Sequence, residues 1–498
     1  MRTLYTFHGG IHPPSHKAQS TQKPIARAPV PSTLIVPFHQ HAGEAAKPVV
    51  QAGNHVLRGQ LIGLPDGFIS SAVHAPTSGT ITAIGMHSVA HPSGLPNLCA
   101  TLVPDGKDEW TTLSPVTDYR SHSPAELQQL LRMSGVVGLG GAAFPSDIKL
   151  RVGKLKISTL ILNGAECEPY ITCDDMLMRK SAGDIVRGAE MLRFMLDANE
   201  VLYAVEDNKP EAILALQQAI SASSPDLQLG GRHEVIAIPT IYPGGSAKQL
   251  IRVLTGLEVP SGKLPTDIGV QCFNVATAGS VFRALAHGEP LLSRIVTITG
   301  NVRNAQNFEA LIGTPVDELI ALGDVLPNTN GYIMGGPMMG MSLPGVNVPV
   351  VKATNCVIAA SENIFPLPPP ALPCIRCTRC VEVCPADLQP QDLYWFSKSR
   401  DFGKAQASSL FDCIECGACS YVCPSHIPLV QYYRFAKSEI HAREKEKRAA
   451  DIARERHEFH LYRIEREKQE KAEKLAAREK AAVAAKAVVE HTGESVTK

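Results

Sequence analysis

The sequence of 498 residues has few aromatic residues, 5% of the total, and no run of about 18 consecutive apolar residues. We therefore expect no helix of this chain to span a bilayer by itself. The sequence also lacks an excess of charge of either sign, since 48 Lys and Arg balance 48 Asp and Glu. This balance argues against a protein whose main partner is nucleic acid or an acidic membrane surface. The first residues, MRTLYTFHGGIHPP, lack the apolar segment of a signal peptide.

Cysteine, in contrast, is abundant but unevenly placed. Eight of the thirteen cysteines follow residue 370. An odd, clustered set does not fit a secretory disulfide framework, so we expect the chain in a reducing cytosol. The other five share no spacing and are expected to be buried side chains: Cys99, Cys167, Cys173, Cys272 and Cys356.

The first part of the chain predicts an arm followed by a small β domain. Residues 1–24 are rich in His, Pro, Ser and Gln and are expected to form a flexible arm. Residues 25–110 contain short apolar runs separated by glycines, which is typical of closely spaced strands. The segment KPVVQAGNHVLRGQLIG followed by VHAPTSGTI resembles the biotinyl and lipoyl carrier domains, which are flattened β-sandwiches. Phe68 occupies the place of their modified lysine, so no swinging arm is expected.

The rest of the chain predicts a multidomain α/β protein. Residues 120–288 alternate strands (158–164, 200–205) with amphipathic helices, including one that starts at the capping residue Ser123. Besides the cysteine-rich domain at 374–436, three further segments are predicted after residue 288. They are a β-rich domain at 289–345, a proline-stiffened linker at 346–373 and a charged tail, helical or disordered, at 437–498.

Two cysteine runs are the strongest signal in the sequence. Residues 374–385 read CIRCTRCVEVCP and residues 413–424 read CIECGACSYVCP. Each is a CxxCxxCxxxCP run, the spacing of bacterial ferredoxins, in which the fourth cysteine of one run ligates the other cluster. We therefore predict two [4Fe-4S] clusters, one held by Cys374, Cys377, Cys380 and Cys423, the other by Cys413, Cys416, Cys419 and Cys384. Paired structural zinc sites are the alternative, but they do not explain the third cysteine step or the repeated CP ending.

A glycine-rich loop in the middle domain indicates a phosphate-bearing cofactor. Residues 135–149 read GVVGLGGAAFPSDIK and follow a predicted helix rather than a strand, so the loop is not a Rossmann turn. Closely spaced glycines let backbone N–H groups approach a phosphate, and Lys149 adds a positive charge. A plain turn is the alternative.

This loop, together with LILNGAECEP, IYPGGSAKQL and FNVATA, resembles the FMN-binding subunit of respiratory complex I. The resemblance implies FMN as cofactor. It implies a cofactor-binding role for twelve residues: Gly138, Gly140, Gly141, Phe144, Lys149, Asn163, Glu166, Glu168, Tyr242, Gly245, Asn274 and Thr277. For Glu166 and Glu168, simple turn carboxylates are the alternative.

Some positions depart from that pattern. Leu139 stands where the family has Arg, and Ala165 where it has Asp. Ser246 and Ala247 stand where it has two Glu that are associated with the nicotinamide nucleotide. FMN binding therefore carries over better than binding of NADH as substrate.

The order of domains resembles the RnfC family of the Rnf ion-translocating complexes over residues 25–435, with a β-grasp domain resembling the soluble-ligand-binding domains from VTITG onward. The resemblance implies a peripheral electron-transfer subunit at the cytoplasmic face of the bacterial inner membrane. Its expected partners are the other subunits, NADH, and ferredoxin or another low-potential carrier, with no nucleic acid. Electrons would pass between NADH and ferredoxin through FMN and the two clusters, coupled to ion translocation.

Two other functions remain open at this point. One is a soluble flavin and iron-sulfur reductase, similar to the cobalamin reductase that has the same domain string. The other is a non-catalytic adaptor with a vestigial flavin site. Recovery with washed membranes and flavin content after purification would separate the three.

Overall fold

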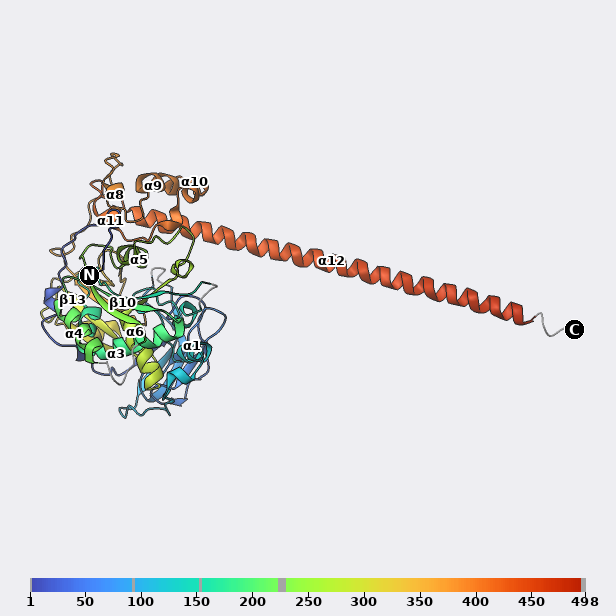
Figure 1. Cartoon of the computed structure of the whole chain (residues 1–498), viewed down its shortest axis with the longest axis horizontal. Helices are drawn as coiled ribbons and strands as arrows, with labels where there is room; N and C mark the ends of the chain where they lie inside the picture. Colours follow the sequence, from blue (N-terminus) through green and yellow to red (C-terminus); the bar gives the residue numbers. More distant parts are fainter. Residues whose placement is uncertain (1, 92–94, 152–154, 223–229, 494–498) are drawn as a thin grey trace.

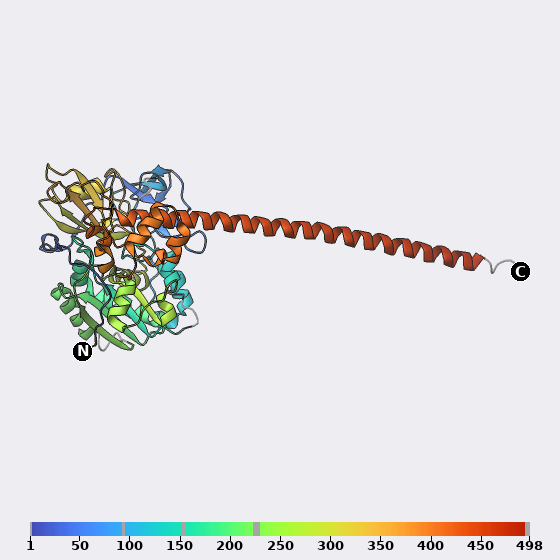
Figure 2. The ribbon, with the colours of Figure 1, turned by 90° about the horizontal axis from the view of Figure 1, so that it is seen from above.

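The computed structural model describes residues 2–91, 95–151, 155–222 and 230–493. Four packed units form a globular body, and one very long helix, α12 (Leu429–Gly493), projects from it (Figures 1 and 2). Among the described residues, no helix is both long enough and apolar enough to cross a membrane.

The amino-terminal β domain consists of two small antiparallel sheets. One sheet has the order β2-β8-β7-β4, with β2 at Leu34–Pro37, β8 at Asn97–Pro104, β7 at Gly79–His87 and β4 at His55–Val56. The other has the order β3-β5-β6, at Lys47–Pro48, Leu61–Leu64 and Val73–His74. Apolar side chains of both sheets, such as Val36, Ile62 and Leu102, share one core.

The middle domain has a parallel sheet of order β11-β10-β9-β12. The strands are β11 (Arg232–Ile238), β10 (Glu200–Glu206), β9 (Thr159–Gly164) and β12 (Val270–Asn274). The helices are α1 (Pro124–Met133), α2 (Ser146–Lys149), α3 (Cys173–Leu196), α4 (Pro210–Ala222), α5 (Ala247–Thr255) and α6 (Val275–Ala286). Ser123 and Glu126 form a capping box at the start of α1, as the sequence predicts. The strand order reverses between β9 and β12, and parallel sheets bind ligands at such a point, beyond the carboxyl ends of the strands.

The third unit is a mixed sheet of order β1-β14-β13-β17-β15-β16. Its strands are β1 (Ala26–Arg27), β14 (Gln306–Leu311), β13 (Ser293–Gly300), β17 (Cys356–Ala360), β15 (Gly331–Met334) and β16 (Met341–Ser342), with helix α7 at Val316–Ala321. The predicted linker 346–373 is wrong at β17, which is buried at every position and pairs in parallel with β13. The prediction failed because a five-residue strand next to a proline run has no periodic signal of its own. The strand β1 also belongs to this sheet rather than to the first domain.

The amino-terminal arm is packed, not flexible, so this prediction is also wrong. The ammonium of Lys17 is buried and donates to the carbonyls of Glu166, Glu168 and Ile171 at 2.7, 2.8 and 2.5 Å. The backbone of Ile11 exchanges hydrogen bonds with that of Tyr242. The composition of the arm is polar and therefore predicted exposure to solvent. The prediction failed because the hydrogen-bond partners of these polar groups lie about 150 residues away in the sequence.

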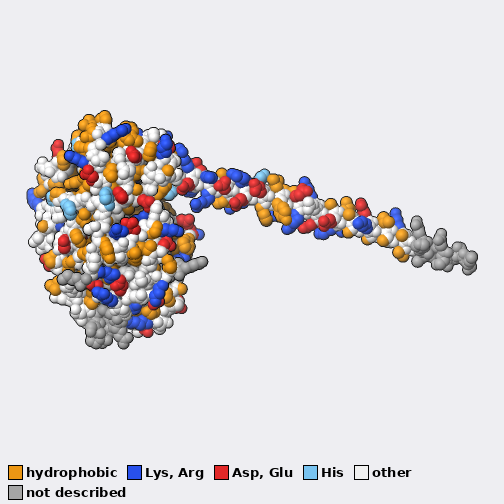
Figure 3. All heavy atoms as spheres, turned by 45° about the horizontal axis from the view of Figure 1, so that its top comes forward, with side chains coloured by type: hydrophobic (Ala, Val, Ile, Leu, Met, Phe, Trp, Pro, Cys, Tyr) orange, Lys and Arg blue, Asp and Glu red, His pale blue; other side chains and the backbone are white. Residues whose placement is uncertain are grey.

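The cysteine-rich module follows, with α8 (Arg379–Glu382), α9 (Pro390–Lys398), α10 (Phe402–Ala407), α11 (Ala418–Tyr421) and the first turns of α12. Short 3-10 helices lie at Ala18–Ser20, Tyr119–Ser121, Pro265–Ile268 and Leu410–Asp412. Beyond the module, α12 is exposed and densely charged (Figure 3).

Candidate functional site

A cavity of about 420 Å³ lies beyond the carboxyl ends of β9 and β12. Its walls come from the middle domain, the mixed sheet and the cysteine-rich module. The structure brings together on these walls all the predicted cofactor-binding residues except Gly141: Gly138, Gly140, Phe144, Lys149, Asn163, Glu166, Glu168, Tyr242, Gly245, Asn274 and Thr277. Gly141 is exposed and lies in the same loop with a φ of +117°, a conformation that favours glycine.

The glycine-rich loop is fixed against the amino end of α6. The amide of Gly138 donates to the carbonyl of Phe144 at 2.7 Å, which closes the loop. The Thr277 hydroxyl accepts from the Leu139 amide at 2.9 Å. An added Cβ on Gly140 would lie 3.3 Å from the Cβ of Asn274, so a larger residue there would crowd the cavity wall. The loop therefore presents bare backbone to a ligand.

Lys149 supplies the positive charge. Its buried ammonium donates to the carbonyl of Cys272 and lies 4.5 Å from the centre of the Phe273 ring. Burial lowers the pKa of Lys149. It is the only basic residue among the described residues that line the cavity. A buried cation beside glycine backbone fits the phosphate of FMN.

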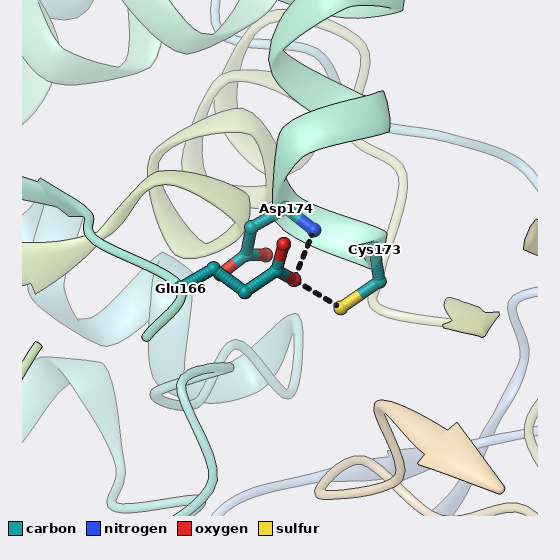
Figure 4. A group of neighbouring side chains, drawn as sticks. All are labelled: Glu166, Cys173 and Asp174. Carbon is teal, nitrogen blue, oxygen red and sulfur yellow. Dashed lines mark hydrogen bonds between the residues drawn. The ribbon is translucent and has the colours of Figure 1, made fainter. Parts of the chain in front are cut away.

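Glu166 is turned toward the start of α3 rather than into open space. Its carboxylate accepts from the Asp174 amide at 2.8 Å and from the Cys173 thiol at 3.3 Å (Figure 4). A carboxylate at this position caps the helix and complements its dipole. Glu166 therefore shapes the cavity wall, and its structural role agrees with the turn-carboxylate alternative.

Glu168 joins the middle domain to the mixed sheet. Its carboxylate accepts from the amides of Met338 and Met339 at 3.2 and 2.7 Å. Burial raises the pKa of Glu168 to about 7. The loop that carries Met339 thus closes one side of the cavity.

Some cavity residues were not identified from the sequence. Asp174 accepts a hydrogen bond from the Asn274 amide group at 2.5 Å, and burial raises its pKa to about 7. Met339, Asn355 and Ile414 also line the cavity from other units. For Asp174, the pair of aspartates at the start of a helix was the available sequence signal. Met339, Asn355 and Ile414 reach the cavity only through tertiary packing, which the sequence does not indicate.

The turn at 241–247 connects the cavity to the cysteine-rich module. The Asn163 side chain donates to the Gly245 carbonyl at 2.8 Å. An added Cβ on Gly245 would lie 2.3 Å from the Ala165 carbonyl, so only glycine permits this approach. The Tyr242 hydroxyl donates to the carbonyl of Cys416. Ser246 and Ala247 also line the cavity.

The eight predicted iron ligands surround two small cavities in the quartets that their spacing predicts. One cavity is lined by Cys374, Cys377, Cys380 and Cys423, which we call the outer quartet. The other is lined by Cys384, Cys413, Cys416 and Cys419, the inner quartet. All eight cysteines are free of disulfides.

The chemistry of these quartets fits iron-sulfur clusters. Burial raises the pKa of Cys416 to about 12 and that of Cys380 to about 11. Four thiolates close together are therefore unfavourable unless a positive core offsets their charge, which iron supplies.

The inner quartet adjoins the flavin-type cavity. Ile414 lines both that cavity and the inner-quartet cavity. Tyr242 packs with Cys416 and Ala418 in one apolar cluster. Tyr433, at the start of α12, lies among thiols of both quartets, and their charges raise its pKa further above the value set by burial. Together the cavity, its neighbouring quartet and the second quartet define a class: a flavin and iron-sulfur electron-transfer protein.

Comparison with protein families agrees with this class, unit by unit. Residues 131–283 match the Nuo51 FMN-binding domain, and residues 5–107 match the RnfC barrel sandwich hybrid domain. Residues 295–342 match the SLBB domain, and residues 373–427 match a 4Fe-4S dicluster domain. The chain thus contains domains of the FMN-binding and iron-sulfur types.

Curated relatives identify the family. The chain is 47% identical over 476 residues to the C subunit of the ion-translocating oxidoreductase complex of Pseudomonas aeruginosa, covering 95% of this chain and 60% of the relative. It is 48% identical over 467 residues to that of Yersinia pestis bv. Antiqua, covering 93% of this chain and 74% of the relative. The chain belongs to the family formed by the C subunits of ion-translocating oxidoreductase complexes. It spans 60% and 58% of the relatives from Pseudomonas aeruginosa and Edwardsiella ictaluri.

Among solved structures, an NAD+-reducing [NiFe]-hydrogenase in the H2-reduced state matches with a TM-score of 0.46 and 16% identity. The match covers 66% of this chain and 63% of that one.

Proposed function

We propose that the chain is the peripheral electron-transfer subunit of a membrane complex that couples electron transfer between NADH and ferredoxin, or another low-potential carrier, to ion translocation. Family membership and the FMN-type and dicluster-type domains support this proposal. A location at the cytoplasmic face of the bacterial inner membrane fits a member of such a complex. In the same proposal, the mixed sheet is a β-grasp, since the central parallel pair β13 and β17 is flanked by β14 on one side and by the hairpin of β15 and β16 on the other. Helix α7 connects β14 to β15.

One observation carries the proposal: the predicted flavin cavity and the inner quartet share a wall. Ile414 is part of both, and Tyr242 reaches from the cavity to the Cys416 carbonyl. FMN, when bound, exchanges two electrons with NADH and one at a time with an iron-sulfur cluster. A shared wall supports such an exchange, because it brings donor and acceptor close together.

The residues of the cavity have distinct proposed roles. The glycines at 138 and 140 give backbone access, and Lys149 binds the phosphate. The carboxylate of Asp174, held by the Asn274 amide, is placed to exchange protons with a ligand in the cavity. Glu166 and Glu168 hold the walls through backbone amides. Ser246 and Ala247 leave room for a nucleotide without offering it a carboxylate.

The eight cysteines hold two [4Fe-4S] clusters in this proposal. Tyr433 lies in one apolar cluster with cysteines of both quartets, so we place the outer quartet next on the path away from the cavity. The predicted order is cavity, inner quartet, outer quartet.

The direct test is anaerobic purification of the full chain, followed by NADH addition with optical and EPR detection. We expect about eight irons and one FMN per chain, flavin bleaching, and then signals of reduced clusters. Flavin-free protein, or iron well short of this value, contradicts the proposal. Flavin that is reduced chemically but not by NADH removes NADH as the substrate and leaves the cofactors in place.

A further inference from the structure

The two cysteine runs are related by an internal pseudo-symmetry that extends to their backbone. Arg376 and Glu415 occupy equivalent positions with φ of +54° and +58°. Thr378 and Gly417 are also equivalent, with φ of +63° and +80°, and each precedes a four-residue helix, α8 or α11. The two loops therefore have the same backbone conformation but different side chains.

The inner loop already has a partner within the chain. Ile414 faces the flavin-type cavity, and Tyr242 bonds the Cys416 carbonyl. Gly417 lies against the loop of the mixed sheet, where an added Cβ would be 2.9 Å from the Met338 carbonyl. The face formed by residues 414–417 is thus the surface through which the inner quartet meets its redox neighbour.

The equivalent face of the outer loop, residues 375–378, meets solvent. Ile375, the counterpart of Ile414, is 67% exposed. Arg376, Cys377 and Thr378 are exposed as well. Leu372, just before the run, is also exposed, at 59%. Exposed apolar side chains beside a redox centre are typical of an interaction surface.

The charges of the two faces differ in sign and in pairing. Glu415 of the inner loop is held by Arg434 and Lys437 at 2.9 Å each. Arg376 is the only charged residue among the described residues that line the outer-quartet cavity. In the described part of the chain, neither Arg376 nor the nearby exposed Arg379 forms an ion pair with an acidic side chain.

We propose that residues 375–379 form the docking surface for a small redox protein that carries Asp and Glu around its own exposed redox group. Ile375 makes the apolar contact that Ile414 makes on the inner side, and Arg376 and Arg379 select the acidic partner. In the encounter one electron passes between the outer cluster and the partner's redox group; one is oxidised as the other is reduced, and no bond or proton is exchanged. This inference rests on the proposed function, to which it adds the chemical character of the external electron-transfer partner.

The test uses the anaerobic full-length holoprotein and a purified acidic two-cluster ferredoxin as the probe. We expect Arg376→Glu with Arg379→Glu to weaken ferredoxin binding and slow the second-order electron transfer by about tenfold or more at low ionic strength. The wild-type rate should fall steeply with added salt, while the rate of the double variant should rise or stay flat. Ile375→Ser should weaken binding with little change in salt dependence.

A matched control separates this surface from overall charge. Lys445→Glu with Arg448→Glu changes the net charge equally on the exposed part of α12, away from the quartets. It should leave binding and rate close to wild type. Iron content and reduction of the inner cluster from the flavin are measured in every variant, so that loss of the outer cluster is distinguished from loss of docking.

The proposal is overturned if the Arg376 and Arg379 variant binds and exchanges electrons with ferredoxin as the wild type does, or if the control variant loses as much. Failure of the proposed function looks different, since flavin or iron would then be missing before any ferredoxin is added.

Discussion

The inner and outer quartets have the same cysteine spacing but opposite surroundings. The inner one is enclosed by the flavin-type cavity, the amino-terminal arm and the start of α12, and its carbonyl groups accept hydrogen bonds from Tyr242, His8 and Lys437. The outer one opens to solvent at Cys377 and Ile375. The motif therefore determines which cysteines can act together, while the packing around each run determines what each centre can exchange electrons with.

The largest expected contrast comes from removing one ligand on each side. Cys416→Ala deletes a buried ligand in the module core and should cost the inner cluster and much of the module's thermal stability. Cys377→Ala deletes an exposed ligand and should cost the outer cluster, about half of the iron, with a smaller drop in Tm. Iron analysis and thermal unfolding under anaerobic conditions measure both. Each variant should lose about half of the iron, and equal drops in Tm in the two variants would contradict the distinction between the halves.

Exchanging the two equivalent helix-start residues should give effects of opposite sign. Gly417→Thr puts a β-branched side chain at positive φ and against the Met338 carbonyl, which should destabilise the protein by about 2–5 kcal/mol. Thr378→Gly relieves the same backbone strain at an exposed site and should be neutral or stabilising by up to about 1 kcal/mol. Chemical denaturation of the two variants decides the comparison, and a destabilising Thr378→Gly would break it.

Dependence on pH should arise on the inner side, at Glu168. Its pKa is raised from 4.5 to about 7 by burial, with the Lys17 ammonium and the Tyr242 hydroxyl as neighbours. The native state then binds more protons than the unfolded state between these values. Stability should therefore fall by up to about 1.4 kcal/mol per pH unit as pH rises from 4.5 to 7, and level off above.

Glu168→Gln removes this contribution, so the difference in stability between wild type and variant should change with pH over that window. Asp174, whose pKa is also raised to about 7, is present in both proteins and cancels. Thermal unfolding of flavin-free protein at several pH values provides the measurement. Parallel profiles for the two proteins would show that Glu168 does not titrate there.

The smallest expected effect on stability compares two buried tyrosines. Tyr242→Phe and Tyr433→Phe each delete one hydrogen bond to a carbonyl, of Cys416 and of Pro390, and should each cost about 1 kcal/mol. Only Tyr242→Phe changes the contact between the flavin-type cavity and the inner quartet. Flash-induced reduction kinetics should therefore shift in that variant and not in Tyr433→Phe; equal kinetic changes would remove the special role of Tyr242.

How far the sequence predicts this molecule depends on how local each signal is. The cysteine runs predict the membership of both quartets, because ligand spacing follows from cluster geometry. The strands at 159–164 and 200–206 and the capped helix at Pro124–Met133 were predicted within a residue or so from periodicity and capping. Eleven of the twelve residues taken from the resemblance do line one cavity.

What the sequence did not predict depends on long-range packing. The strand Cys356–Ala360 looked like a linker because it is short and precedes a proline run, yet it completes a buried sheet. Lys17 looked like part of a solvated arm, yet three carbonyls from the middle domain surround its ammonium. The different surroundings of the two quartets also depend on long-range packing. Neither CIECGACSYVCP nor CIRCTRCVEVCP indicates which run faces the cavity.

The order cavity, inner quartet, outer quartet is tested most directly by photoreducing the flavin in the two cysteine variants and recording rapid-freeze EPR spectra. This choice of reductant makes the result independent of NADH. We predict that Cys377→Ala still shows a reduced inner cluster, whereas in Cys416→Ala the flavin is reduced and the outer cluster stays oxidised on the same timescale. Reduction of the outer cluster in Cys416→Ala at the wild-type rate would contradict the account.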